Sequence, residues 1–349
     1  MYEAMRVVLA DPPAFTPPYD HELAAALGRA GAEVELVTSR FRFGAVPDPV
    51  GYRRSELFYP LSSRLFRRSR FRLPLKALEH PFGLALLAAR RADVTHLQWL
   101  AAPELDARLL RVRGPLVFTA HDIVPRRTAG KLELWRRLFG RFDRIVVHSA
   151  RGYETLAGLG VDEAKLRVIS HPVFPSDPVR ADDGRTVLAL GMIRPYKQVD
   201  HSLAAAAAAG ARLLVAGDTV GLLPQLPGAE LRLGYLSAAE LERALGESTV
   251  AVFPYLPELD QSGALLQALG AGVPAVVYDV GGLGETVREF GAGRVVPADD
   301  VAALGAAVRE LLDDSAALEA ARAGARRARE TLTWDAAAAA HLELYRELV

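Results

Sequence analysis

The chain of 349 residues contains no cysteine, and this absence excludes disulfide bonds, thiolate catalysis and zinc sites built on cysteine. No apolar run is long enough to span a membrane, and the N-terminus does not read as a secretory signal peptide. We therefore expect a cytoplasmic protein. Its length and apolar content predict two domains of ordinary size, each with its own core.

Several nucleotide and hydrolase motifs are also missing. The sequence has no G-x-x-x-x-G-K-[ST] and no G-x-S-x-G, which argues against a P-loop enzyme and an α/β-hydrolase. Gly270, Gly272 and Ala275 fit a relaxed dinucleotide fingerprint, but they follow an expected helix and precede an expected strand, the reverse of the required order. Because no D-x-D triplet occurs, we expect no metal-chelated diphosphate and no metal cofactor.

The formal net charge of zero conceals two halves of opposite sign. Residues 1–172 contain 27 Lys and Arg against 18 Asp and Glu, a net charge of +9. Residues 173–349 contain 15 against 24, a net charge of −9. This asymmetry predicts two domains that face each other, with an N-terminal half that prefers an anionic partner or surface.

The first half alternates apolar strand signals with helical patterns. A helix is expected over Asp20–Ala30, ending before Gly31. Short apolar runs predict strands at Met5–Ala10, Glu33–Thr38, Val94–Gln98, Leu116–Ala120 and Ile145–Ser149. This order is typical of a parallel, doubly wound sheet.

The same pattern restarts in the second half, after a segment that reads as a hinge linker. Ser170–Arg185 carries three prolines and no hydrophobic periodicity. Strands are then expected at Thr186–Leu190, Arg212–Ala216 and Ala251–Pro254, with helices at Asp200–Ala209 and Ser237–Leu245. Ser237 and Glu240 have the spacing of a capping box. These signals predict a second α/β domain.

The stretch of residues 250–287 contains a junction suited to an anion. A strand, Val250–Pro254, is followed by the polar loop Glu258–Gly263 and a helical turn at Ala264–Leu269. The free amides and the positive end of the helix dipole attract a phosphate, and Ser-Gly permits close backbone approach. Every doubly wound sheet has such junctions, so this feature alone leaves nucleotide binding and a purely structural turn equally open.

Fixed positive charge follows the first strand of the second half. Arg194 and Lys197 lie three residues apart on a loop that precedes the Asp200 helix. Such a loop can direct both cations at the carboxyl edge of the sheet, where ligands of open α/β sheets bind. The alternative is a pair of solvated charges at a helix start, where they would oppose the helix dipole.

With these residues in place, the chain resembles the family 4 glycosyltransferases over almost its whole length. The family has an E-x7-E pattern, then an A-x-x-x-G-x-P run and a Gly-Gly loop. The residues that match the run and the loop are Ala268, Gly272, Pro274, Gly281 and Gly282. Gln267 stands where the family has its second glutamate, and Leu259 where it has the first, with Glu258 one position earlier.

The resemblance implies a set of site residues. His121, Arg194 and Lys197 are the catalytic candidates, since His121-Asp122 resembles the family's His-Asp and the two cations resemble its diphosphate clamp. The donor-binding candidates are Gly191, Glu258, Gln261, Ser262, Gly263 and Gln267. The acceptor-side candidates are Tyr19, Trp99 and Asp122.

The implied fold is α/β of the GT-B type, two Rossmann-like doubly wound domains that face a central cleft. Residues 1–172 would form the acceptor domain and residues 173–333 the donor domain. Residues 334–349, which begin at Trp334, would form a helix that crosses back to the first domain. The implied reaction transfers a sugar from a nucleoside diphosphate to an acceptor hydroxyl with retention of configuration. The leaving phosphate accepts the acceptor's proton, and no cofactor is needed.

The acceptor is the least determined part, and a glycan, a lipid-linked molecule or a small molecule all remain open. Ser63–Lys76 interleaves cations with Leu and Phe, a pattern typical of contact with anionic lipid and equally of a solvated surface helix. The arginines expected to make a membrane contact are Arg67, Arg68, Arg70 and Arg72. Nucleic acid is not expected as a partner. A sugar-nucleotide epimerase of the same shape and a non-catalytic sugar-nucleotide binding protein are the rival functions.

Overall fold

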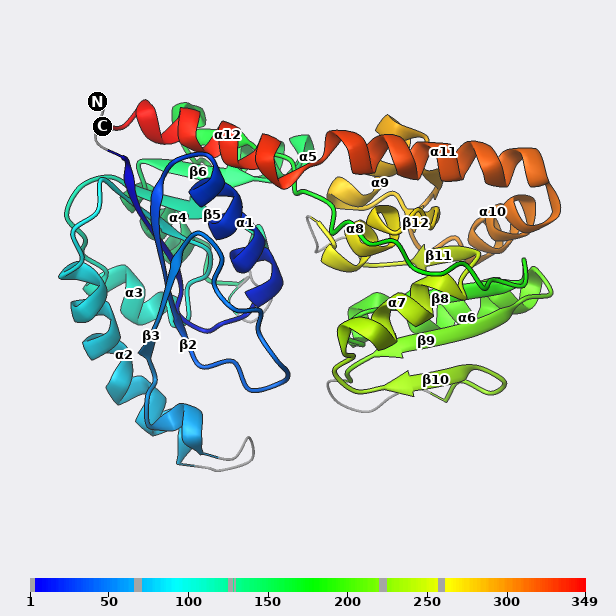
Figure 1. The fold of residues 1–349 in the computed structure, drawn as a ribbon, viewed down its shortest axis with the longest axis horizontal. Coiled ribbons are helices and arrows are strands. Elements are labelled where there is room, and N and C mark those ends of the chain that lie inside the picture. Colours follow the sequence, from blue (N-terminus) through cyan, green and yellow to red (C-terminus); the bar gives the residue numbers. More distant parts are fainter. Residues whose placement is uncertain (1–3, 66–70, 125–127, 129, 220–224, 257–260) are drawn as a thin grey trace. The chain divides into compact units, whose positions relative to one another are not determined.

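The computed structural model describes residues 4–65, 71–124, 128, 130–219, 225–256 and 261–349. The chain divides into two compact units: unit 1 is formed by Met1–Ser170 together with Trp334–Val349, and unit 2 by His171–Thr333. In each unit the described residues form a parallel β-sheet with helices packed against it (Figure 1). The expectation of two doubly wound α/β sheets is confirmed.

The described part of unit 1 contains a seven-stranded sheet in the order β3-β2-β1-β4-β5-β6-β7, with every neighbouring pair parallel. The order reverses between β1 and β4, which is the switch point where ligands of such sheets bind. The strands are β1 Arg6–Asp11, β2 Glu33–Ser39, β3 Arg53–Phe58, β4 Val94–Leu97, β5 Leu116–Thr119, β6 Arg144–Val147 and β7 Leu166–Val168.

The helices of unit 1 come from both ends of the chain. They are α1 Pro17–Arg29, η1 Ser62–Arg64, α2 Arg72–Ala88, α3 Pro103–Leu109, α4 Leu132–Arg141, α5 Ala150–Gly158, η3 Glu163–Lys165 and α12 Trp334–Arg346. The C-terminal α12 lies beside α1, red beside blue in Figure 1. Its Tyr345 hydroxyl is 2.6 Å from Nδ1 of His96 on β4, so the last helix is tied into the core of this unit.

The described part of unit 2 contains a six-stranded parallel sheet in the order β10-β9-β8-β11-β12-β13. Its strands are β8 Thr186–Leu190, β9 Arg212–Gly217, β10 Glu230–Leu233, β11 Val250–Phe253, β12 Ala275–Tyr278 and β13 Gly293–Val296. Its helices are η4 Pro195–Lys197, α6 Val199–Ala208, α7 Ala238–Gly246, α8 Gly263–Gly270, α9 Gly281–Phe290, α10 Val301–Asp313 and α11 Ser315–Thr331.

Strand β8 shows why these strands read as unbroken apolar runs. Leu188 and Leu190 belong to the core shared with α8, α9 and α11. Val187 and Ala189 belong to a second core, which β8 shares with α6 and α10. Successive side chains of a strand point to opposite faces, so a strand covered by helices on both sides needs apolar residues at every position.

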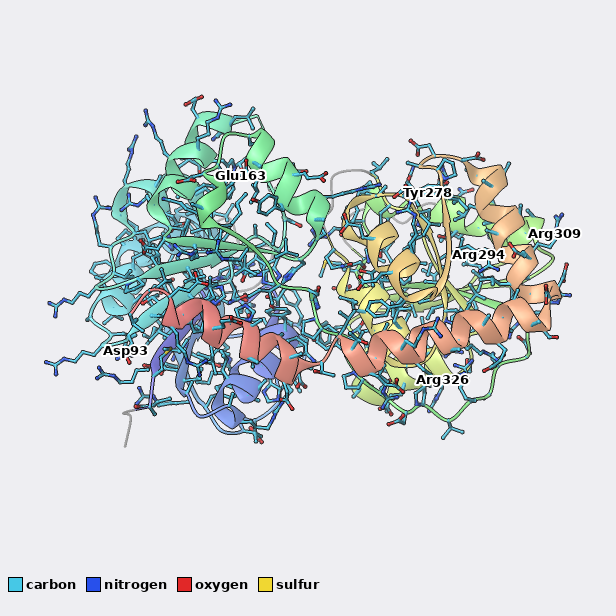
Figure 2. The ribbon with its side chains drawn as sticks, turned by 90° about the horizontal axis from the view of Figure 1, so that it is seen from above. Asp93, Glu163, Tyr278, Arg294, Arg309 and Arg326 are labelled. Carbon is cyan, nitrogen blue, oxygen red and sulfur yellow. The ribbon has the colours of Figure 1, made fainter. Side chains whose placement is uncertain are left out.

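Hydrogen bonds and ion pairs connect the strands of each sheet to the segments beside them. In unit 1, Asp93 accepts a hydrogen bond from the amide of Arg6 at 2.8 Å and pairs with its guanidinium. In unit 2, Tyr278 and Arg294 come from the neighbouring strands β12 and β13, and Arg294 pairs with Glu310 at 2.6 Å. Asp93, Tyr278 and Arg294 are labelled in Figure 2.

The predicted capping box is confirmed, whereas the segment expected to be a hinge is hydrogen-bonded to the rest of unit 2. Ser237 and Glu240 form the capping box at the start of α7. The segment that precedes β8 has no helix or strand over residues 171–185, as expected, but its backbone is bonded to unit 2. The amides of Val173, Ser176 and Ala181 donate to the carbonyls of Leu332, Gly270 and Gly246. Because these amides are paired, this segment is held as a part of unit 2 and is not a free hinge.

Among the helices of the described ranges, not one is long and apolar enough to cross a bilayer.

Candidate active site

Lys197 is the central cation of unit 2. It ends the short helix η4, which follows β8 at the carboxyl edge of the sheet. Its side chain is only 8% exposed, its Nζ donates to the carbonyl of Leu190 at 3.1 Å, and the same atom lies 4.9 Å from the centre of the Tyr255 ring. Burial, with a smaller effect from the charge of Arg194, lowers the pKa of Lys197 to about 7.

Gly191 lies between the amine of Lys197 and the start of α8. The residue has a positive φ of 94°. A Cβ added at Gly191 would lie 2.9 Å from Nζ of Lys197 and 3.1 Å from Cβ of Ala264. The glycine therefore permits a close approach of the chain to a lysine amine on one side and to the first turn of α8 on the other. A cation and a helix N-terminus thus meet at one point.

The polar residues before α8 are partly occupied by one another. Ser262 caps the helix by accepting a hydrogen bond from Leu265 N at 3.3 Å, and its own amide donates to Oε1 of Gln261 at 2.9 Å. Gln261 Nε2 donates to Oγ1 of Thr286 at 3.1 Å. The Ser262 amide is therefore not free for an anion, which corrects the expectation for the Ser-Gly pair. The remaining amides at this end belong to Gly263 and Ala264, and the first turn of α8 carries no acidic residue.

The other candidates for donor binding differ from Lys197 in their exposure. Arg194 is exposed, and its Nη2 lies 3.1 Å from Sδ of Met192. Its position differs from the buried position of Lys197, so the two cations are not equivalent. Gln267 is half-buried on α8. Glu258 lies outside the described residues.

In unit 1, His121 lies two residues after the end of β5 and is surrounded by aromatic rings. Its ring is stacked on Trp99, with centroids 5.2 Å apart and 15° between the planes. Tyr19, from the first turn of α1, meets it edge to face at 4.7 Å. Trp99 Nε1 donates to Oγ1 of Thr16 at 2.8 Å, which fixes the indole against the loop between β1 and α1. The structure thus brings together three of the predicted residues, and Asp122 follows His121 in the loop, half-buried.

Two further side chains fix the protonation of His121. His148 Nδ1 lies 2.9 Å from the carbonyl of Ile169 and must donate to it, so Nε2 of a neutral His148 is an acceptor. That Nε2 lies 3.3 Å from Nδ1 of His121, which donates to it. Burial lowers the pKa of His148 to about 4, so this ring is neutral at pH 7.

Nε2 of His121 then remains as an acceptor, and it lies 3.0 Å from the position of Oε1 of Gln98. The other amide atom, Nε2 of Gln98, is buried and lacks a hydrogen-bond partner in the described part of the chain. The amide orientation in which the nitrogen and oxygen of Gln98 exchange places lets the amide donate to Nε2 of His121. Gln98 was not among the predicted site residues. Its position at the end of an apolar strand, immediately before Trp99, was the signal that could have identified it.

A buried carboxyl pair supports the same loop. Asp11 ends β1, and its Oδ2 accepts hydrogen bonds from the amides of Phe15 and Thr16 at 2.7 and 3.1 Å. Its side chain is also hydrogen-bonded to Asp20. Burial raises the pKa of both carboxyls, that of Asp20 well above its ordinary value, so Asp20 donates a retained proton to Asp11. A pair of aspartates nine residues apart carried no recognisable sequence signal.

Within the described ranges, no three His, Asp or Glu side chains gather closely enough to hold a metal ion.

Two family models match most of the chain. The model for Glycosyltransferase Family 4 matches residues 19–176, and the model for Glycosyl transferases group 1 matches residues 184–314. No curated protein sequence matches.

Solved structures share the fold at low sequence identity. Sucrose-phosphate synthase from Thermosynechococcus elongatus is 21% identical with a TM-score of 0.75, and the match covers 99% of both chains. HepE from Anabaena, solved with UDP-glucose, is 15% identical with a TM-score of 0.68, covering 99% of this chain and 100% of the other. The catalytic domain of starch synthase IV from Arabidopsis thaliana, bound to ADP and acarbose, is 14% identical with a TM-score of 0.68 and 99% coverage of both.

Proposed function

The chain belongs to the family 4 glycosyltransferases, and on that basis we propose that it transfers a sugar from a nucleoside diphosphate to an acceptor hydroxyl with retention of the anomeric configuration. The observation that carries this proposal is the meeting of Lys197 Nζ and the first turn of α8 at Gly191. A buried cation beside the amides at the start of a helix is the combination that a departing diphosphate requires.

The chemistry follows from where charge develops. Cleavage of the bond between sugar and phosphate leaves negative charge on the diphosphate and positive charge on the sugar ring. Lys197 and the amides of Gly263 and Ala264 stabilise the diphosphate, and Arg194 contributes from its exposed position. The leaving phosphate accepts the proton of the attacking hydroxyl on the same face of the sugar. We place His121 at the sugar, with its Nδ1 proton fixed by His148.

The proposed reaction needs no metal ion. Three features of the chain support this: the sequence has no D-x-D triplet, Lys197 is built into the site, and the start of α8 carries no acidic residue. Lys197 is poised near neutral pH, and a bound diphosphate favours its charged form because an opposite charge raises the pKa of an ammonium group.

The donor can be identified by thermal unfolding with UDP, GDP, ADP and dTDP. A ligand at 100 times its dissociation constant adds about 2.7 kcal/mol to the free energy of unfolding. UDP and ADP are the first to test because HepE and starch synthase IV were solved with UDP-glucose and ADP. The reaction is then followed by NMR with the matching nucleotide sugar, which reports the anomer of the product.

The outcomes separate the rival functions. Transfer to an acceptor with the donor's anomeric configuration supports the proposal, whereas inversion contradicts its stereochemistry. An isomeric nucleotide sugar formed without acceptor indicates an epimerase. Binding without turnover, over a broad panel of acceptors, indicates a binding protein.

A peripheral contact of unit 1 with anionic membranes is the second part of the proposal. Arg67, Arg68 and Arg70 lie outside the described residues, and Arg72 begins α2. What supports the contact is the exposed face of the same helix: Leu78, Phe82 and Leu86 are 68%, 73% and 49% exposed. Their spacing of four residues places them on one side of α2, as an interfacial helix requires.

Co-sedimentation with vesicles tests this contact. The wild type should bind phosphatidylglycerol vesicles at low salt and dissociate as salt rises. Replacing all four arginines by Gln should weaken binding, and Leu78→Ser with Phe82→Ser should weaken it at every salt concentration. Equal binding by all three proteins, or by none, contradicts a membrane contact here.

A further inference from the structure

A second cationic site lies in unit 1, at the carboxyl ends of β1, β2 and β3. A small cavity of about 40 Å³ opens there. Its walls come from the loops after β1 and β2, from η1 and from the first two turns of α2, and they include Ala14, Arg40, Arg42, Ser62, Arg72 and Lys76. Ligands of open α/β sheets bind at this edge, so the position itself suits a substrate.

Positive charge gathers around this cavity, whose described lining residues include no carboxylate. Four of its lining residues are cations. In the described part of the chain, neither Arg40 nor Arg42 forms a hydrogen bond or an ion pair. The nearby carboxylate of Glu79 is held by the amides of Leu61 and Ser62, at 2.6 and 3.0 Å. Like charges repel at close range, so such a cluster is stabilised when an anion occupies its centre.

Ser62 provides an independent indication of a ligand. Its side chain is 1% exposed, and its Oγ has no hydrogen-bond partner in the described part of the chain. A buried hydroxyl without a partner is destabilising and rare in folded proteins. An anion in the cavity that Ser62 lines would accept its hydrogen bond.

The backbone around the cavity is held in an unusual conformation. Ala14 and Tyr59 both line the cavity, and both have a positive φ, 53° and 57°. Side chains rarely adopt this region, and such residues concentrate at ligand sites. Ala14 belongs to the same loop as Thr16, whose hydroxyl holds Trp99 against His121. One loop therefore connects the cationic cavity to the predicted acceptor-side residues.

We infer that this cavity binds the phosphate group of the acceptor. The inference rests on the proposed function in one respect, that the acceptor binds to unit 1. A cavity of this size has room for about three water molecules, so it suits a phosphate group and excludes a whole sugar. Arg40 and Arg42 would bind phosphate oxygens through paired N–H donors, Lys76 and Arg72 would add charge, and Ser62 would donate a hydroxyl.

Phosphate binding can be measured without any donor. All three tryptophans of the sequence, Trp99, Trp135 and Trp334, lie in unit 1, so tryptophan fluorescence reports the unfolding of this unit. The midpoint of unfolding is measured in sodium phosphate and in sodium chloride of equal ionic strength. Every protein carries Lys197→Ala, which removes the cation of unit 2 as a competing phosphate site.

Two variants of equal charge provide the comparison. Arg40→Gln with Arg42→Gln changes the cavity. Arg91→Gln with Arg113→Gln changes two exposed arginines that precede β4 and β5, at the opposite edge of the same sheet. We expect phosphate to stabilise the parent and the second variant. The dissociation constant of phosphate should rise at least about tenfold in the first, because each charge-assisted hydrogen bond contributes that much.

The source of the phosphate is distinguished by competition. A soluble hexose phosphate or phosphatidylglycerol vesicles are added to the parent in phosphate, with unphosphorylated hexose and phosphatidylcholine as controls. Competition by hexose phosphate indicates a sugar phosphate acceptor. Competition by phosphatidylglycerol vesicles indicates a lipid headgroup. Equal stabilisation of all three proteins by phosphate, or of none, overturns the inference. Donor turnover is measured separately on protein that retains Lys197, so failure of the proposed function is recognised on its own.

Discussion

The two units share one fold and carry opposite chemistry at the same edge of their sheets. In unit 1 this edge holds His121, His148 and a buried carboxyl pair, packed among aromatic rings. In unit 2 it holds Lys197 and the start of α8. The acidic half of the chain thus contains the buried cation, and the basic half contains the neutral histidine. Net charge therefore describes the solvated surface of a unit, whereas burial selects the chemistry of its site.

Burial lowers the pKa of a base in each unit, with different consequences for the charge of the two sites. It keeps His148 neutral, which fixes the direction of each hydrogen bond to His121. It brings the pKa of Lys197 to about 7, so the charge of unit 2 becomes sensitive to its ligand. Unit 1 therefore carries a buried base that is neutral at pH 7, whereas unit 2 carries a buried base that titrates near pH 7.

The largest effect is expected from the buried cation. Lys197→Ala should lower turnover roughly 100- to 1000-fold and weaken nucleotide binding, because it removes a preorganised charge from the leaving group. Arg194→Ala should lower turnover by only about tenfold, since an exposed charge is screened by water. Steady-state kinetics and calorimetry measure both. If Arg194→Ala is the more damaging change, burial does not decide the importance of these two cations.

The next effect concerns the stability of unit 1 in acid. The pKa of His148 is about 4 in the folded protein and 6.5 ordinarily, and His341 has the same shift. Between these values the unfolded chain binds protons that the folded unit does not, so the free energy of unfolding falls as pH drops from 6.5 to 4. Each histidine contributes about 3 kcal/mol to this loss.

Two other groups with shifted pKa values must be distinguished from the histidines in this experiment. Asp20 has the opposite sign, because its raised pKa makes the folded unit retain a proton and so stabilises it as pH falls. Lys197 contributes only between pH 7 and 10.5, above this window. Urea unfolding followed by tryptophan fluorescence reports unit 1. His148→Gln with His341→Gln should reduce the pH dependence, and His96, whose pKa burial also lowers, should account for part of the remainder. A tryptophan-detected midpoint that is the same at pH 7 and pH 4.5 contradicts the assignment of neutral buried histidines.

A smaller effect is expected from the frame around His121. Gln98→Leu removes one hydrogen bond to Nε2 of His121, and the loss of about 1.4 kcal/mol corresponds to roughly tenfold in turnover. Nucleotide binding should not change, because Lys197 and α8 belong to unit 2. Gln98→Glu, which can only accept, should raise the pKa of His121 and move the acidic limb of the pH–rate profile upward. An unchanged profile with both variants would make Gln98 a packing residue only.

Nucleotide affinity should respond to pH through Lys197. With a pKa of about 7 for the free protein, the lysine is charged below neutral pH and loses its proton above it. The dissociation constant for a nucleoside diphosphate should therefore rise by about eightfold between pH 6.5 and 8, the limit for release of one proton with this pKa. Lys197→Met should bind more weakly and with little pH dependence over this range. A wild-type affinity that is flat with pH would mean that Lys197 keeps its charge throughout.

The smallest effect is expected from metal removal, which should leave the rate unchanged. Positive charge at the proposed diphosphate site comes from Lys197 and Arg194, so turnover after dialysis against EDTA should equal that of untreated protein. Added magnesium and manganese serve as the comparison. Complete loss of activity with EDTA, restored by either ion, would show that a metal ion, and not Lys197 and Arg194, stabilises the leaving diphosphate.

Much of the fold was readable from the sequence because strands buried on both faces are unbroken apolar runs. Strand β8 was predicted at its true limits, and β1, β2, β4, β5 and β11 within two residues. The edge strands were not predicted. In β3, RRSELF, and β10, ELRL, charged residues interrupt the apolar ones, so no apolar run marks these strands. An edge strand is defined by its neighbour's free hydrogen-bonding groups, which the sequence does not display.

The residue types of the site were also readable in part. A strand followed by Arg194 and Lys197, and a His-Asp after another strand, identified the carboxyl edges of both sheets. The sequence did not show that Lys197 is buried and Arg194 exposed, nor that Ser262 is occupied by capping. Both depend on what packs above these residues.

The sequence by itself determined two parallel doubly wound sheets and which loops lie at their carboxyl edges, because hydrophobic period and helix-ending residues are local properties of the chain. Only the tertiary structure decided the chemistry there. The order Ile169, His148, His121, Gln98 joins residues from four strand ends, and the cavity beside Arg40 and Ser62 joins four segments. The protonation and burial of a side chain, and whether its hydroxyl has a hydrogen-bond partner, depend on residues that become neighbours only when the chain has folded.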